Sequence, residues 1–474
     1  MNKKETSGMI KRAAILVLLV LTSACGTSHR MKAAEINAYM ETGDYKSIIK
    51  KTTGTSIGEK IKTDKLDTLD SLNAGNALFF TEKYKTSINI FDNADIKIDD
   101  YFREAFIKSS AREAAAAINN ASIFDYEPMV MDNIYLSSYK ILSYLALNDT
   151  EGARIEVNKA YTKQQSAAEY FGKQIEKANN DAQSQLNDLD TKNQTLWNNN
   201  KDGAINKNFA DLKKWSGYQD YMNPYTTYLS GLYFIISGQN RSDYENAATY
   251  MKRVAGMVPL NSFVIKDLIQ AENLANFKPT GKEKNVWIIY ENGMVADFEE
   301  IRIDIPAFLF SNNLSFISFS MPKPKLRSQA FQNIIINSDG SPGIKTEILA
   351  DVDSMFIAEY NRKLPALIGR AAAQAITKAI MQYTAYNNDE TGLAGLAATI
   401  YNLSTSPADI RSWHTLPKNV QIAKIKNNKS DTLNIYTSEM VFLEQIKVQP
   451  DRNTIVYIRI PSIMSKPVIS VITL

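Results

Sequence analysis

The chain of 474 residues has a single cysteine, Cys25, and only two histidines, His29 and His414. A disulfide within the chain needs two thiols, and a structural zinc site needs several Cys and His ligands, so both are excluded. The sequence also lacks an excess of one charge, because its net charge is +3 and residues 1–24 alone carry that +3. The remaining residues are neutral overall and exert no net field on a nucleic acid, so we do not expect nucleic acid as a partner.

Cofactor-binding and catalytic motifs are also scarce. Gly54–Lys60 has the glycines of a phosphate-binding loop, but only three residues separate them and Glu59 stands where the lysine is needed. The two histidines are too far apart in sequence for a His-Glu-x-x-His metal site. We therefore expect no cofactor, no bound metal and no enzymatic activity.

What the sequence does contain is a distinctive N-terminal segment. Basic residues precede a short apolar run at 13–21, which is too short to span a bilayer as a helix and is typical of an export signal. Leu21-Thr-Ser-Ala-Cys25 follows and resembles the lipobox of bacterial lipoproteins, which implies cleavage after residue 24 and lipid attachment to Cys25. By the same resemblance, Gly26 in place of Asp favours the outer membrane of a Gram-negative cell. The alternative is that Cys25 is a buried thiol in an N-terminal transmembrane anchor.

Residues 25–280 have few prolines and repeated apolar patterns of helical period, which predicts an all-α domain. Three stretches share small and large apolar residues at offsets typical of tetratricopeptide (TPR) helical hairpins, whose small residues let paired helices approach closely. Their positions are Gly75, Leu78, Ser87, Phe91 and Ala94; Ile141, Tyr144, Ala153, Val157 and Ala160; and Gly231, Phe234, Ala247, Met251 and Val254. A generic helical bundle is the alternative. In either case we expect a concave surface that holds a peptide or a partner helix.

One polar segment, at about 164–215, interrupts this pattern. Its apolar residues lie near a/d spacing, but Gln185 and Lys192 interrupt the seam, so a stable dimer interface is not expected. We predict a projecting helical arm that turns at Asn198–Gly203. This arm either reaches a partner or is simply a long solvated helix.

Residues 281–474 change to alternating apolar and polar residues, which predicts an antiparallel β-rich domain. The predicted strands are 286–290, 300–305, 314–320, 333–336, 420–426, 432–436, 441–448, 454–460 and 468–473. An alanine-rich helical insertion at 354–404 separates the two groups of strands. We expect it to pack on the sheet; contact of residues 364–403 with the bilayer is the alternative. The overall prediction is an α+β fold.

The lipobox, the helical stretch at 135–149, and the sequences VWIIYENG (286–293) and ADIRSWHTLP (408–417) together resemble a family of Gram-negative outer-membrane lipoproteins. Members combine TPR-like helices with a β-rich C-terminal half, and their function is uncharacterised. The resemblance implies a location and an architecture but no activity. We therefore expect a lipid-anchored scaffold or adapter that binds an envelope protein in the periplasm or at the cell surface.

Two further functions remain as alternatives. A cell-wall glycan enzyme, or its activator, would need a pair of carboxylates, for which Glu291, Glu299 and Glu300 are the candidates. A membrane-inserting or secretion-channel accessory protein would use the alanine-rich segment. Arg411, Trp413 and His414 are bunched near Pro417 and are a possible partner contact, because Arg and Trp often anchor interfaces. The alternative there is a tryptophan that plugs the end of the sheet, with His414 exposed.

Overall fold

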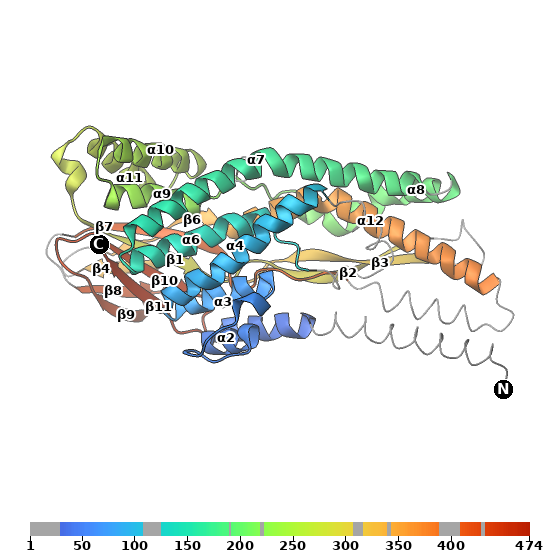
Figure 1. Ribbon diagram of the computed structural model, residues 1–474, viewed down its shortest axis with the longest axis horizontal. Coiled ribbons are helices and arrows are strands. Elements are labelled where there is room, and N and C mark those ends of the chain that lie inside the picture. Colours follow the sequence, from blue (N-terminus) through green and yellow to red (C-terminus); the bar gives the residue numbers. More distant parts are fainter. Residues whose placement is uncertain are drawn as a thin grey trace.

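The computed structural model describes residues 29–107, 125–188, 191–218, 222–306, 316–338, 343–387, 408–427 and 432–474. Helices occupy its N-terminal half and sheets rich in antiparallel pairs its C-terminal half, which confirms the α+β class (Figure 1). Cys25 and the predicted export signal lie outside the described residues, as does the part of the predicted helical insertion after residue 387. No described helix is both long and apolar enough to cross a bilayer.

The helices begin where capping side chains are available. Asp67, Asp149, Asn223, Asn240 and Asn261 each accept a hydrogen bond from a backbone N–H of the first helical turn. After a first helix at 29–42, the helices are α2 (Tyr45–Thr53), α3 (Thr68–Phe80), α4 (Tyr84–Ile107), α6 (Val130–Ala146), α7 (Thr150–Asn187), α8 (Thr191–Phe209), α9 (Pro224–Ser237), α10 (Arg241–Met257), α11 (Ser262–Ala275) and α12 (Val352–Asn387). Short 3-10 turns are η1 (Thr63–Lys65), η3 (Ala210–Leu212) and η5 (Pro279–Lys282).

Helices α3 to α11, without α8, form one layer that we call the helical array. Within it α3 packs on α4, α6 on α7, and α9 on α10, and neighbouring pairs are in contact. Small residues make this possible: a Cβ on Gly75 would lie 2.5 Å from the Phe91 ring, and one on Gly231 would lie 3.0 Å from Met251 Cε. The helix pairs therefore approach closely at these positions of the predicted hairpin pattern.

The strands form three sheets. The central sheet has the order β11 (Val468–Thr473), β10 (Thr454–Ile460), β1 (Asn285–Asn292), β7 (Asn419–Lys426), β6 (Glu347–Asp351). A two-stranded ribbon pairs β2 (Asp297–Pro306) with β3 (Phe316–Lys325), and a small sheet has the order β5 (Ile344–Lys345), β4 (Ile334–Ser338), β8 (Thr432–Thr437), β9 (Phe442–Lys447). All printed pairs are antiparallel except β1 with β10, in which Val286 pairs with Thr454 in parallel.

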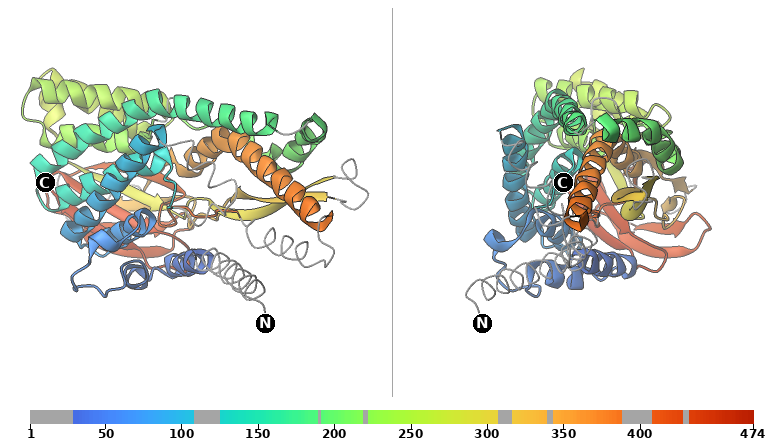
Figure 2. Two further views of the ribbon diagram at one scale, coloured as in Figure 1. Left: turned by 45° about the vertical axis from the view of Figure 1, so that its right-hand side comes forward. Right: turned by 90° about the vertical axis from the view of Figure 1, so that its right-hand side faces the viewer.

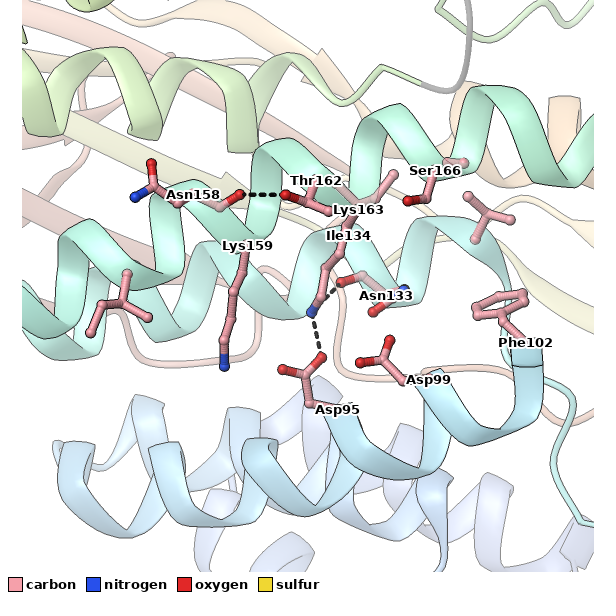
Figure 3. Close-up of a pocket in the computed structure, with 13 residues that line it drawn as sticks. Asp95, Asp99, Phe102, Asn133, Ile134, Asn158, Lys159, Thr162, Lys163 and Ser166 are labelled. Carbon is pink, nitrogen blue, oxygen red and sulfur yellow. Dashed lines mark hydrogen bonds and ion pairs between the residues drawn. The ribbon is translucent and has the colours of Figure 1, made fainter. Parts of the chain in front are cut away.

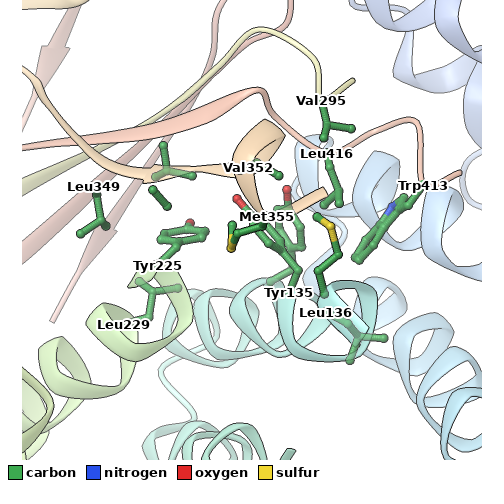
Figure 4. Close-up of a cluster of buried hydrophobic side chains, with 14 of the residues drawn as sticks. Tyr135, Leu136, Tyr225, Leu229, Val295, Leu349, Val352, Met355, Trp413 and Leu416 are labelled. Atoms are coloured by element: carbon green, nitrogen blue, oxygen red, sulfur yellow. The ribbon is translucent and has the colours of Figure 1, made fainter. Parts of the chain in front are cut away.

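The helical array covers the central sheet and shares one hydrophobic core with it. Phe79 of α3 packs edge-on against Tyr457 of β10, and Trp287 of β1 donates a hydrogen bond to Asp267 of α11 at 3.0 Å. Figure 4 shows the same contact farther along, where Tyr135 and other side chains of α6 and α9 meet Val352, Leu349 and Trp413. The expectation that the concave side holds a partner is wrong in this state, because the chain's own sheet occupies that side.

The predicted arm is present as the distal part of α7 together with α8, but it does not project alone. Figures 1 and 2 show that it runs beside α12 and the ribbon, and that these elements extend together from the body. A Cβ on Gly369 of α12 would lie only 3.0 Å from Ala182 Cβ of α7, so the two helices are closely packed there. The predicted turn at Asn198–Gly203 is wrong, since α8 continues through it.

Candidate functional site

A groove opens between α4 and α7, with α6 as its floor, and has a volume of about 550 Å³ (Figure 3). This volume lies within the range of small-molecule pockets. We call it the outer groove; its lining residues are Asp95, Asp99, Phe102, Val130, Asn133, Ile134, Ile155, Asn158, Lys159, Thr162, Lys163, Ser166 and Ala167. One end is apolar, because Val130, Ile134 and Ala167 form a small separate cluster of buried side chains there, packed against Phe102. The other end is polar and charged.

A network of buried charges holds the floor of the groove together. The Lys140 ammonium is 1% exposed and lies 2.7 Å from Glu156 Oε2, 2.9 Å from Asp92 Oδ1 and 3.3 Å from Asp95 Oδ2. Lys163 pairs with the other oxygen of Asp95. Burial alone would raise the pKa of Asp95, but the two lysines outweigh it and hold that pKa below its ordinary value. The acids and lysines of the network therefore stay charged and fix α4 against α6 and α7.

Two acceptors in the groove have no partner among the described residues. Asp99 makes no printed ion pair or hydrogen bond, and burial together with the nearby charge of Asp95 raises its pKa. The Oδ1 atom of Asn133 is buried and accepts no hydrogen bond. In Figure 3 these two side chains lie close to each other, between Asp95 and Phe102. The ammonium of Lys159, on the opposite wall, has no printed ion pair either.

A second polar cluster lies between the helical array and the central sheet, centred on Glu291. Its Oε2 atom accepts hydrogen bonds from Tyr139 at 2.9 Å and Tyr457 at 2.8 Å, while Oε1 has no partner. Arg459 donates to the backbone oxygens of Glu291 and Gly293, and its Nε lies 3.9 Å from Glu291 Oε2. Both side chains are fully buried, and this burial raises the pKa of Glu291. The cluster joins the two halves of the fold and offers no access to a substrate.

The predicted partner contact at residues 411–414 is buried rather than exposed. Trp413 and His414 are 2% and 1% exposed, and the Arg411 side chain pairs with both oxygens of Asp409. The expectation of an accessible Arg411, Trp413 and His414 cluster is therefore wrong, because the sheet and array close over the two rings. Trp413 indeed plugs the junction, donating to Thr415 Oγ1 at 2.8 Å, but His414 is not exposed as the alternative expected.

His414 and Ser412 both lie near Asp297, a set of residue types that suggests a catalytic triad. The geometry does not form one: Ser412 Oγ donates to Asp297 Oδ1 at 3.0 Å instead of approaching the histidine, and His414 Nδ1 is 3.4 Å from the same oxygen. Burial would raise the pKa of Asp297, but His414, Arg327 and Asn37 together hold it well below its usual range. These residues tie the first helix and the ribbon to the 408–418 segment.

The carboxylates proposed for glycan cleavage are not brought together as an open pair. Glu291 is buried in the central sheet, whereas Glu299 and Glu300 are neighbours on the ribbon, paired with Lys325 and Arg30. Gly54-Thr-Ser-Ile-Gly58 has the Gly-x-Ser-x-Gly spacing of a hydrolase elbow, which needs a strand before it and a helix after it. Here it follows helix α2 instead. Among the described residues, no three His, Cys, Asp or Glu side chains are grouped to hold a metal ion.

The chain matches none of the known protein-family models, and no curated protein or solved structure is significantly similar to it. The geometry therefore has to carry the functional argument. The outer groove was not predicted from the sequence, although a signal was present: Asp92, Asp95 and Asp99 fall on one face of α4, and Lys159 and Lys163 on one face of α7.

Proposed function

We propose that this protein is a lipid-anchored adapter of the bacterial envelope, tethered through Cys25 and binding a partner protein through the outer groove of a TPR-like helical array. The lipobox at 21–25 supports the anchor, since several acyl chains hold a protein on a bilayer almost irreversibly. The resemblance of this region to bacterial lipoproteins supports the outer membrane as its location. The close contacts at Gly75 and Gly231 support TPR-like hairpins.

The observation that carries the choice of surface is the difference between the two sides of the array. The chain's own sheet covers the inner side, which is the side that helical repeats commonly use for ligands. On the outer side, the groove between α4 and α7 keeps unpaired polar groups beside apolar ones. Pockets of this composition are the usual places for specific recognition.

The anchor is tested by mass spectrometry of the protein from bacterial membranes. We expect a chain that begins at Cys25 and carries acyl groups, and a Cys25→Ala variant that is released from the membrane fraction. An uncleaved chain with an unmodified thiol would reject the lipid anchor and with it the adapter proposal.

The partner surface is tested by site-specific photo-cross-linking in living cells. A cross-linker at Thr162, on the groove wall, is expected to give one discrete conjugate that is lost when Asp99→Lys is added. A cross-linker at Thr249 of α10, also exposed on the array, is the matched control and should not give that conjugate. The same conjugate from both positions would show that the groove is not the specific contact.

A further inference from the structure

The outer groove contains more negative than positive charge close to its floor. Four carboxylates, those of Asp92, Asp95, Asp99 and Glu156, lie around the two ammonium groups of Lys140 and Lys163. Lys159 on the opposite wall adds one positive charge at the rim, so the groove remains one charge short of neutrality. A bound cation would correct this imbalance.

The unpaired groups indicate where such a cation would lie. Asp99 and the Oδ1 atom of Asn133 are both acceptors without a partner, on two different helices that face each other across the groove. A group that donates several hydrogen bonds and carries positive charge satisfies both acceptors at once, as an ammonium or a guanidinium does. A carboxylate or phosphate would instead face two acceptors and be repelled.

The apolar end of the groove indicates what is attached to the cation. Phe102, Val130 and Ile134 lie directly beyond Asp99 and Asn133. A long alkyl or aryl stem that leads away from the charged group would cover these side chains and remove their apolar surface from water. The groove is too large for a bare ammonium ion and has room for a drug-sized molecule or for a side chain with its neighbours.

We propose that the outer groove binds a cationic amphiphile, in which an ammonium or guanidinium group lies between Asp99 and Asn133 and an apolar stem lies over Ile134 and Phe102. Two sources have this chemistry: a lysine or arginine beside an apolar residue of a partner protein, and a free amine with a hydrophobic body. The first source rests on the proposed adapter function, whereas the site itself does not.

The test measures binding of small probes to the purified mature chain carrying Cys25→Ser, by ligand-observed NMR. The probes are 4-phenylbutylamine, the neutral 4-phenylbutanol and the anionic 4-phenylbutyrate. We expect the amine to bind at least about tenfold more tightly than the alcohol, a difference of about 1.4 kcal/mol, and the acid to bind least. Equal binding of amine and alcohol would overturn the proposal.

Two substitutions locate the cation. Asp99→Asn keeps the shape of an exposed side chain and should weaken amine binding at least about tenfold without changing alcohol binding. Asp100→Asn, at the next residue of the same helix and outside the groove lining, is the matched control and should leave both unchanged. Identical effects of the two substitutions would overturn the assignment of Asp99.

The two sources are separated with a capped Leu-Arg-Leu peptide. If this peptide binds more tightly than 4-phenylbutylamine, and Asp99→Asn weakens it, the ligand is a side chain of a partner. If the amine binds more tightly, the ligand is a free cationic molecule. Amine binding in vitro without any Thr162 conjugate in cells would retain the site and reject the adapter function, so the two proposals fail separately.

Discussion

The two sides of helix α6 carry polar side chains in different states. Tyr135 and Tyr139 point to the central sheet, while Asn133 and Lys140, about half a helical turn away around the axis, point to the outer groove. The sheet side is fully buried and its polar groups join one half of the fold to the other. The groove side combines a paired floor with unpaired acceptors near the surface. Burial of polar groups in this protein therefore has two uses, a permanent internal junction and a candidate binding site.

The junction should be the side that is most sensitive to substitution. Arg459→Ala removes a buried cation that bonds two backbone oxygens and lies over the Phe80 ring, so we expect a loss of about 3–5 kcal/mol in the free energy of unfolding. Urea denaturation measures it. Arg302→Ala, which removes a guanidinium exposed by 66% on the ribbon, should cost less than about 0.5 kcal/mol. Similar losses for both would show that the junction does not depend on Arg459.

The junction side should also make stability depend on pH. Burial raises the pKa of Asp132 to about 7, although Tyr126 and the backbone N–H of Met129 donate hydrogen bonds to it. The native state therefore keeps a proton that the unfolded chain releases near pH 4, and stability should fall as pH rises from about 4 to 7, by about 1.4 kcal/mol per unit. Asp132→Asn should flatten this decline in denaturation series at several pH values. An unchanged slope would contradict the assignment.

Carboxylates with a lowered pKa act in a separate pH range. Asp297, for example, stabilises the native state above the ordinary pKa of an aspartate, and this contribution is lost as pH falls below about 4. The two effects can therefore be measured in one series without interference.

Close packing between helices of the array should have an intermediate effect. Gly75→Ala places a methyl group within 2.5 Å of Phe91, so we expect a loss of about 1–3 kcal/mol in unfolding free energy. Gly172→Ala on α7 meets no atom within 4 Å and should instead stabilise the protein by up to about 1 kcal/mol, because alanine favours helix. Thermal unfolding of the two variants compares them. A stabilising Gly75→Ala would mean that α3 and α4 are not held at this distance.

The outer groove should be the least sensitive region. Lys159→Ala and Asp99→Asn alter side chains that have no printed ion pair, so each should change the free energy of unfolding by less than about 0.5 kcal/mol. The same urea denaturation used for Arg459 measures this. A loss above 2 kcal/mol for either would show that the groove is part of the structural core and not a site free for a ligand.

Much of the secondary structure could be predicted from the sequence because it depends on local patterns. The alternation of Val456, Ile458 and Ile460 with polar residues predicted a strand at 454–460, and β10 has those bounds. Strand β6 was missed, since Glu347–Asp351 is too short to show alternation. The Asn292-Gly293 turn gave no information on pairing, and β1 pairs with β7 and β10 instead of β2.

The candidate site was harder to predict because its parts come from three helices. Trp413 and His414 were taken as a surface contact since neighbouring Arg, Trp and His residues are common in interfaces. Their burial depends on the array closing over the sheet, through contacts such as that of Asn76 with Thr415, 339 residues later in the chain. Nothing local to residues 408–417 signals such long-range closure. The outer groove likewise requires knowing that α4 and α7 lie on either side of α6.

The parallel pairing of β1 with β10 also has a consequence for how the molecule is made. β1 is central in its sheet, and one of its two neighbours begins only at Thr454. During synthesis or transport across a membrane, the helices and the strand at 285–292 would emerge long before that neighbour exists. The apolar residues that β10 later covers would stay exposed to aggregation during this interval, so early segments would need a holding chaperone until the last strands arrive.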